Sequence, residues 1–167
     1  RDRKAVNRDL EEIQHFMFEE IWDPNFGQEA SECFYDLAMS SAVMLHEEGQ
    51  GDKTFHQRAI PITDFFLERG SDDLIGGVFR KNKMKAGMLP HTYRHAKISG
   101  ALEQMVTKEH DKDITVIEYT GRDYSKHGEA YRHRIMVEGI DEIIQSRDMA
   151  GAGANPFHSM QIGRADG

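Results

Sequence analysis

The chain has 167 residues, of which 38% are hydrophobic and 30% charged, and its formal net charge at pH 7 is −8. This length and composition are typical of a single globular domain, and no apolar run approaches the roughly 20 residues that a membrane-spanning helix needs. The net acidity excludes indiscriminate binding to polyanions, although a local basic face still sets the local field, and a lone cysteine excludes an internal disulfide.

Two helices are predicted in the N-terminal third of the chain. Residues 7–22 repeat apolar side chains at steps of three and four residues, as on one face of a helix; these are Leu10, Ile13 and Met17. Residues 28–48 are predicted to form a second helix, in which Cys33 is an unreactive core thiol.

The middle of the chain is predicted to be mostly helical. Residues 54–62 are expected to be short and extended, and residues 63–69 to form a short capped helix. A third helix is predicted over residues 72–85, although Gly76-Gly77 weakens it by about 1 kcal/mol each relative to alanine. A good helix then follows over residues 91–109.

The C-terminal part mixes both kinds of element. Residues 113–121 and 129–137 are each too short for periodicity to separate a strand from a buried helix. Residues 139–147 are predicted to be a last helix, and the Gly/Ala-rich residues 149–167 a mobile tail. The predicted fold class is therefore α+β, mainly helical, with a small β-hairpin or sheet at one edge.

One segment is basic in an otherwise acidic chain. Between Leu74 and Leu102 there are six Lys or Arg and no Asp or Glu, so the remaining residues sum to (21 − 6) − 29 = −14. Within it lies His91-x-x-Arg94-His95, which has three interpretations: a solvated helix start, a metal site or a phosphate site. Zinc would need further ligands that nothing in the sequence places. An arginine fork beside a histidine suits phosphate.

"AGMLPHTYRHA" resembles the box that carries His-x-x-Arg in the tyrosine recombinases, the phage integrase family. Downstream, "DITVIEYTGRDYSKHGEAYRH" is similar to the segment that carries the family's nucleophilic tyrosine, with Tyr131 at its spacing and Arg122 where the family has His or Trp. Upstream, "GDKTFHQRAIPI" is similar to the segment of the family's hairpin lysine, here Lys53. "FGQEASECFYDL" looks like the box Gly-x-Arg-x-x-Glu, but Glu29 stands where the first catalytic arginine belongs.

The resemblance implies a catalytic domain over residues 1–148, a flexible tail over 149–167, and no N-terminal core-binding domain. It implies DNA cleavage and rejoining through a 3′-phosphotyrosine intermediate, with neither a metal nor a cofactor. The implied nucleophile is Tyr131, and Arg94 would clamp the phosphate. His91 would donate or accept a proton, Lys53 would act as general acid, and Arg122 would be a further donor to the phosphate.

The resemblance also implies that double-stranded DNA is the partner. The cations expected to hold its backbone, unless they form only a solvated face, are Arg80, Lys81, Lys83, Lys85, His95 and Lys97. A homo-oligomer, a tetramer on DNA, is expected through the helix 139–147, unless that helix packs on its own domain. The expected location is the nucleoid, or a mobile element or virus inside the cell.

Three other interpretations are open. Glu29 is compatible with a catalytically impaired recombinase fold that only binds DNA. A winged-helix domain would use residues 91–109 as its recognition helix and residues 114–137 as its wing. The acidic surface would also suit a protein-interaction or virion-assembly module.

Overall fold

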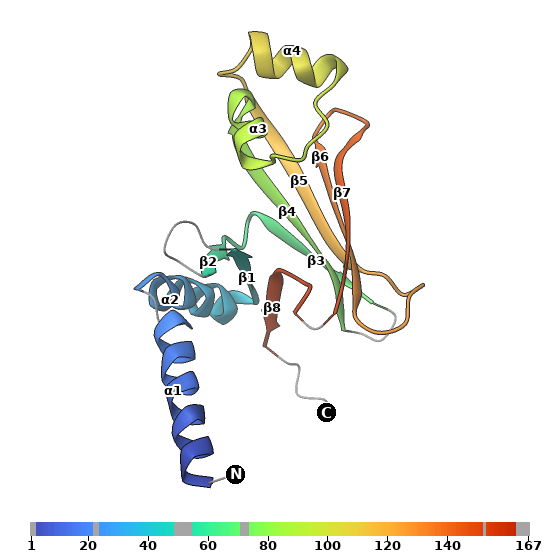
Figure 1. Ribbon diagram of the computed structural model, residues 1–167. Coiled ribbons are helices and arrows are strands. Elements are labelled where there is room, and N and C mark those ends of the chain that lie inside the picture. The colour runs from blue at the N-terminus through green and yellow to red at the C-terminus, as the bar shows by residue number, and fades with distance from the viewer. Residues whose placement is uncertain (1–2, 22–23, 49–54, 71–73, 152, 163–167) are drawn as a thin grey trace. The chain divides into compact units, whose positions relative to one another are not determined.

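The computed structural model describes residues 3–21, 24–48, 55–70, 74–151 and 153–162. The chain divides into two compact units, each with its own antiparallel sheet (Figure 1). The first unit comprises Arg1–Ile62 and Pro156–Gly167, and the second comprises Thr63–Asn155.

The first unit contains two helices and a three-stranded sheet in the order β2–β1–β8. Its elements are α1 (Arg3–Ile21), α2 (Pro24–Met39), β1 (Ser41–Glu48), β2 (Phe55–Ile60) and β8 (Phe157–Gln161). Helix α2 packs on this sheet, with Cys33 and its neighbours Phe26, Ala30 and Leu37 against Ala42 and Met44. The predicted helix at the N-terminus and the predicted extended segment are confirmed as α1 and β2.

Burial explains the end of the second helix. The prediction of one helix over residues 28–48 is wrong, because α2 ends at Met39 and β1 begins at Ser41. Five consecutive residues from Ser41 to Leu45 are buried, since β1 is the central strand between β2 and β8. A strand buried on both faces has no alternating pattern that would distinguish it from a buried helix.

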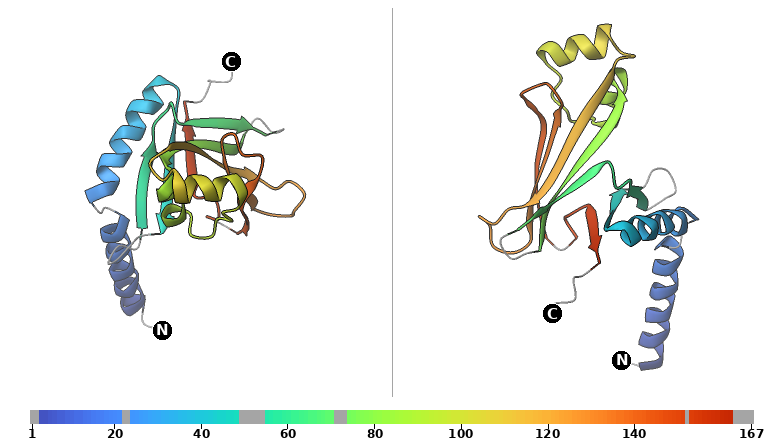
Figure 2. Two further views of the ribbon diagram at one scale, coloured as in Figure 1. Left: turned by 90° about the horizontal axis from the view of Figure 1, so that it is seen from above. Right: turned by 180° about the vertical axis from the view of Figure 1, so that it is seen from behind.

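The second unit is a five-stranded meander in the order β3–β4–β5–β6–β7. Its strands are β3 (Phe65–Arg69), β4 (Ile75–Lys85), β5 (Asp113–Arg122), β6 (Ala130–Val137) and β7 (Ile143–Ala150). A 3₁₀ turn (Ala86–Met88), α3 (Leu89–Thr92) and α4 (Gly100–Lys108) connect β4 to β5. Figures 1 and 2 agree that these helices lie at one end of the sheet and the β5–β6 turn at the other.

The core of the second unit lies where the helices cover the sheet. Leu89 and Leu102, exposed by 0% and 2%, pack on apolar side chains of β5, β6 and β7. Those strand residues are Ile114, Val116, Ile135, Val137 and Ile144.

The prediction of a mainly helical fold is wrong, because strands hold more of the described residues than helices do. Residues 63–69, 72–85 and 139–147 were predicted to be helices, and β3, β4 and β7 lie there instead. In β4 the sheet face that carries Val78 and Met84 also carries Arg80 and Asn82. Polar side chains at those positions hide the period-two alternation that marks a strand.

The glycines of β4 also have a sheet-based explanation. Gly77 lies opposite Gly121 on β5, and a Cβ at either position would clash with the ring of Tyr119. That ring also packs on Phe79, with 4.4 Å between ring centroids, and its hydroxyl donates to Glu68 Oε2 at 2.7 Å. The glycine pair therefore makes room for an aromatic ring rather than weakening a helix.

Of the remaining predictions, some are wrong and others are resolved by the structure. Residues 91–109 do not form one helix, since α3 ends at Thr92 and α4 begins at Gly100. The two segments left open between strand and helix are the strands β5 and β6. The expected mobile tail contains the end of β7 and also β8, which pairs with β1 from Phe157 to Gln161; residues 163–167 lie outside the described part.

Candidate assembly surfaces

The residues predicted to be catalytic do not converge. Tyr131 lies opposite Arg122 at the end of β5 that is far from α3, whereas His91 and Arg94 lie in and just after α3, at the other end of the sheet. The ten residues of β5 span about 30 Å at roughly 3.3 Å per residue. Tyr131 also pairs with Met149 of β7, so the sheet holds it in place and it cannot reach Arg94.

Two other members of the predicted active site have different positions. Lys53 lies outside the described residues. The carboxylate of Glu29 accepts a hydrogen bond from the backbone N–H of Ala59 at 2.6 Å, and the side chain of Asn25 donates to the Gln57 carbonyl at 2.6 Å. Glu29 therefore ties α2 to β2 and does not replace a phosphate-binding arginine.

The basic character of β4 is explained by acids on neighbouring elements. Arg80 pairs with Glu118 of β5 at 3.5 Å, and Lys85 pairs with Asp113 at 2.7 Å. Lys81 pairs with Glu138, which follows β6, at 3.8 Å. Lys83 is exposed. The acid-free stretch is thus one part of a cross-strand charge pattern, in which three of the cations predicted to hold DNA pair with carboxylates.

One of these ion pairs is buried. The side chains of Arg80 and Glu118 are only 9% and 7% exposed, and the hydroxyl of Tyr93 donates a short hydrogen bond to Glu118. Asn82 in turn donates to the Tyr93 hydroxyl at 3.2 Å. Burial, and then the Glu118 carboxylate, raise the pKa of Tyr93, so that its hydroxyl remains a donor. The cluster joins α3 to the sheet.

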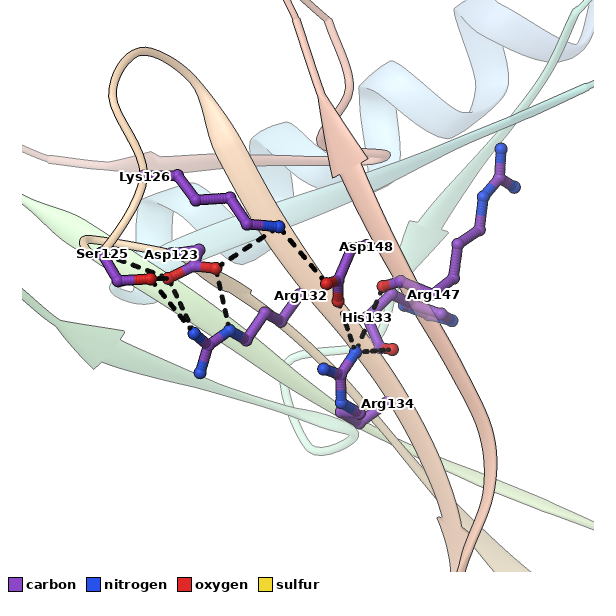
Figure 3. Close-up of polar contacts among 8 residues, drawn as sticks. All are labelled: Asp123, Ser125, Lys126, Arg132, His133, Arg134, Arg147 and Asp148. Atoms are coloured by element: carbon purple, nitrogen blue, oxygen red, sulfur yellow. Dashed lines mark hydrogen bonds and ion pairs between the residues drawn. The ribbon is translucent and has the colours of Figure 1, made fainter.

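A second polar network lies at the opposite end of the sheet (Figure 3). Asp123 accepts hydrogen bonds from the Ser125 hydroxyl at 2.6 Å and from Arg132 at 2.9 and 3.0 Å. Asp148 accepts from Lys126 at 3.3 Å and from Arg134 at 3.1 Å. The network ties the β5–β6 turn to β7. The hydrogen bond from Ser125, together with those from Arg132, lowers the pKa of Asp123 to about 2 although its burial opposes this.

The Asp123 network predicts a pH dependence of stability. The pKa of Asp123 falls from 3.8 to about 2 on folding, so the stabilisation is fully present above about pH 4 and is lost as the pH falls towards 2. We expect Asp123→Asn to be less stable than the wild type at pH 7 and to lose this part of the acid dependence. Urea unfolding between pH 2 and 7 measures the free energy of unfolding of both proteins, with Asp141→Asn as a control for loss of an exposed carboxylate. An unchanged acid slope in Asp123→Asn would contradict the assignment.

A shallow groove of about 560 Å³ lies beside β7. Its walls are His95 and Lys97 from the segment between α3 and α4, and residues 143–147 of β7. Two of the lining side chains, Lys97 and Arg147, carry a positive charge and none carries a negative charge. The amide oxygen of Gln145 is buried, and no described residue hydrogen-bonds it.

Helix α1 exposes a complete apolar stripe. Every described side chain from Arg3 to Glu19 is exposed. The spacing of Val6, Leu10, Ile13 and Met17 in steps of four, three and four puts them on one helix face, and their exposed fractions are 41%, 58%, 55% and 54%.

Helix α2 adds a second exposed apolar face. Phe34, Tyr35 and Met39 of α2 are exposed by 67%, 74% and 79%, and none of them belongs to the cluster that packs on the sheet. Aromatic side chains and Met are enriched at protein–protein interfaces. Exposed contiguous apolar surfaces of this kind mark interaction sites.

These exposed apolar surfaces are typical of a protein that assembles with others. A family model described as bacteriophage head to tail connecting protein matches residues 1–147, and the chain therefore belongs to that family. No curated protein matches the sequence.

The family corrects the interpretation of the chain as a tyrosine recombinase or integrase. The chain is a structural phage protein and not a DNA-cleaving enzyme, so the expected DNA recombination through a phosphotyrosine intermediate is wrong. The winged-helix alternative also fails, because residues 91–109 are interrupted and β5 and β6 lie inside a five-stranded sheet. The family agrees instead with the virion-assembly alternative. It also confirms the expected association with a virus, since the family belongs to bacteriophages.

The expected partners change accordingly. A DNA partner is not supported, and the expected oligomerisation helix 139–147 does not exist, since β7 occupies most of that segment and Ile144 packs in the core of its own unit. No helix in the described part of the chain is long and apolar enough to cross a membrane. No group of three or more His, Cys, Asp or Glu that could hold a metal occurs among the described residues.

One buried group behaves as the sequence suggested. Cys33 is 3% exposed, and its thiol lies 3.9 Å from the Val43 carbonyl oxygen. Burial, followed by the negative field of Asp36, raises the pKa of the Cys33 thiol to about 11. A thiol this far from ionisation is a poor nucleophile at neutral pH, as expected for a core thiol.

Proposed function

We propose that this chain is a structural subunit of the phage head–tail junction, where it assembles with its own copies and with other phage structural proteins. The observation that carries the proposal, besides family membership, is the exposed apolar stripe of α1. We further propose that this stripe, Val6 to Met17, is covered in the assembly.

The energetics of α1 support a partner. Burial of one Val, Leu, Ile or Met side chain contributes about 1.5–3 kcal/mol, and the stripe offers four such side chains. Isolated helices gain little from propensity alone and depend on packing of their apolar face. The helix dipole gives α1 no help, because its first turn holds no acid and its last turn no base.

Most charged residues of α1 lie away from the stripe. Lys4, Arg8 and His15 lie on the opposite face of the helix, where Arg8 pairs with Glu12 and His15 with Glu19. The uncharged Asn7 and Gln14 flank the stripe on one side together with Arg3, and Asp9 flanks it on the other. A partner therefore meets an apolar strip with few charges to desolvate, which is the composition of an interface core.

The stripe is tested with a matched pair of substitutions on α1. Leu10→Asp puts a charge in the stripe, and His15→Asp puts the same side chain on the opposite face. We expect sedimentation velocity over a range of concentrations to show the wild type and His15→Asp associating, and Leu10→Asp shifted towards the monomer by at least about tenfold in Kd. Equal association of the two variants would show that the stripe is not an assembly contact.

A further inference from the structure

We infer that the outer edge of β7 receives β3 of a second copy, so that the five-stranded sheet continues from one subunit into the next. The inference rests on the proposed function, because it needs the chain to assemble with its own copies. It names a second contact, separate from the stripe of α1.

The outer edge of β7 is open over half of the strand. Among the described strands β7 pairs with β6 alone. Near its start the Ile144 carbonyl accepts a hydrogen bond from the Lys97 N–H at 2.7 Å, so the backbone of Ile144 points outward. At the far end of the strand the Gly151 N–H donates to the Glu129 carbonyl on the β6 side at 2.8 Å. The pairing of β7 with β6 is regular from Gln145 to Ala150 and the direction of the backbone groups alternates along an antiparallel strand, so those of Ser146, Asp148 and Ala150 point outward.

The open stretch of this edge has a regular strand backbone, because the irregularity in the pairing of β7 with β6 lies before Gln145. Exposed edges are usually blunted by proline or covered by another element, but residues 146–150 contain no proline. The Lys97 segment covers only the first part of the edge. An open row of donors and acceptors is a template on which another strand can add.

The groove beside this edge sets the charge of the occupant. Lys97 and Arg147 make it positive, and the buried amide oxygen of Gln145 has no hydrogen-bond partner in the described part of the protein. Ile143, which is 54% exposed, adds an apolar contact. An occupant should therefore offer an extended backbone, a carboxylate, a hydrogen-bond donor and an apolar side chain.

The other edge of the same sheet has these properties. Among the described strands β3 pairs with β4 alone, and it has five residues, as many as the open stretch of β7. Asp64, just before β3, supplies a carboxylate, as does Glu68, whose Oε2 also accepts from the Tyr119 hydroxyl, and Phe66 is 58% exposed.

Charge also disfavours the symmetric alternative. Pairing of two β7 edges would bring two positive grooves together, and like charges across an interface are repulsive. The β7-to-β3 contact joins different surfaces of identical subunits and therefore propagates head to tail.

The edge is tested with Ser146→Pro and the matched control Ser146→Ala. Proline removes the outward N–H without touching the ladder with β6. We expect Ser146→Ala to associate like the wild type, and Ser146→Pro to associate at least about tenfold more weakly while its circular dichroism and melting temperature stay close to those of the control. Equal association of the two variants would overturn the inference.

Two further measurements remain decisive if the proline variant misfolds. In the wild type, the amides of Ser146, Asp148 and Ala150 should exchange slowly with solvent at high protein concentration and quickly at low concentration; exchange that is independent of concentration would overturn the inference. A mixture of Ser146→Cys and Phe66→Cys chains should form a mixed disulfide. Disulfides formed by Ser146→Cys alone would indicate symmetric β7 pairing and would also overturn it.

The two contacts can fail separately. If Leu10→Asp weakens association and Ser146→Pro does not, the proposed function stands and the edge contact is wrong. If the wild type does not associate at any concentration, the proposal that the chain assembles with its own copies fails, and the edge contact fails with it.

Discussion

Substitution of Glu118 by alanine is expected to lower the free energy of unfolding by about 3–5 kcal/mol. The substitution leaves the guanidinium of Arg80, whose side chain is 9% exposed, without its carboxylate partner inside the sheet. It also removes the acceptor of the Tyr93 hydroxyl. Both losses leave buried polar groups without a partner, and the cost of desolvating them is no longer offset.

A matched control separates burial from loss of a charge. Glu138 forms an ion pair with Lys81 from the same strand as Arg80, but both side chains are exposed, by 55% and 41%. Glu138→Ala should therefore cost less than about 1 kcal/mol. Urea unfolding of the two variants measures the difference. Equal destabilisation would contradict the claim that the Arg80–Glu118 pair is buried.

Substitution of Leu89 by alanine is expected to cost about 2–5 kcal/mol, because it opens a cavity in the core between the helices and the sheet. Leu89 is 0% exposed and packs in the cluster formed by α4, β5, β6 and β7. The adjacent Met88 is 55% exposed, so Met88→Ala should change stability by no more than about 0.5 kcal/mol.

Both variants are measured by urea unfolding at neutral pH. The pair of neighbouring residues controls for backbone effects, since each lies at the junction of the 3₁₀ turn and α3. A cost at Leu89 no larger than that at Met88 would mean that the turn after β4 does not anchor α3 on the sheet.

The sequence predicts correctly those elements whose apolar residues repeat with the period of a helix. The steps of three and four between Leu10, Ile13 and Met17 identify α1 correctly. The sequence could not predict whether that face is buried in its own domain, because a stripe that packs on its own domain and a stripe that packs on another protein have the same spacing. The structure shows it exposed.

The missed strands have inward polar residues whose partners are distant in sequence. Arg80 lies inside the sheet because Glu118, 38 residues away, lies beside it. The resemblance to a recombinase has a similar origin. Arg122 and Tyr131 are nine residues apart because they face each other across the antiparallel pair β5–β6, so a hairpin spacing resembled the spacing of a catalytic segment.

The central claim, that this chain is a structural component of the head–tail junction, is tested most directly by cross-linking mass spectrometry of purified phage particles that encode it. Lys4 provides a reactive amine on α1, on the face opposite the apolar stripe. We predict that the chain is present in the particle and that Lys4 is cross-linked to another copy or to a second structural protein. Absence of the chain from particles, or its recovery only among proteins that act on DNA in infected cells, would contradict the account.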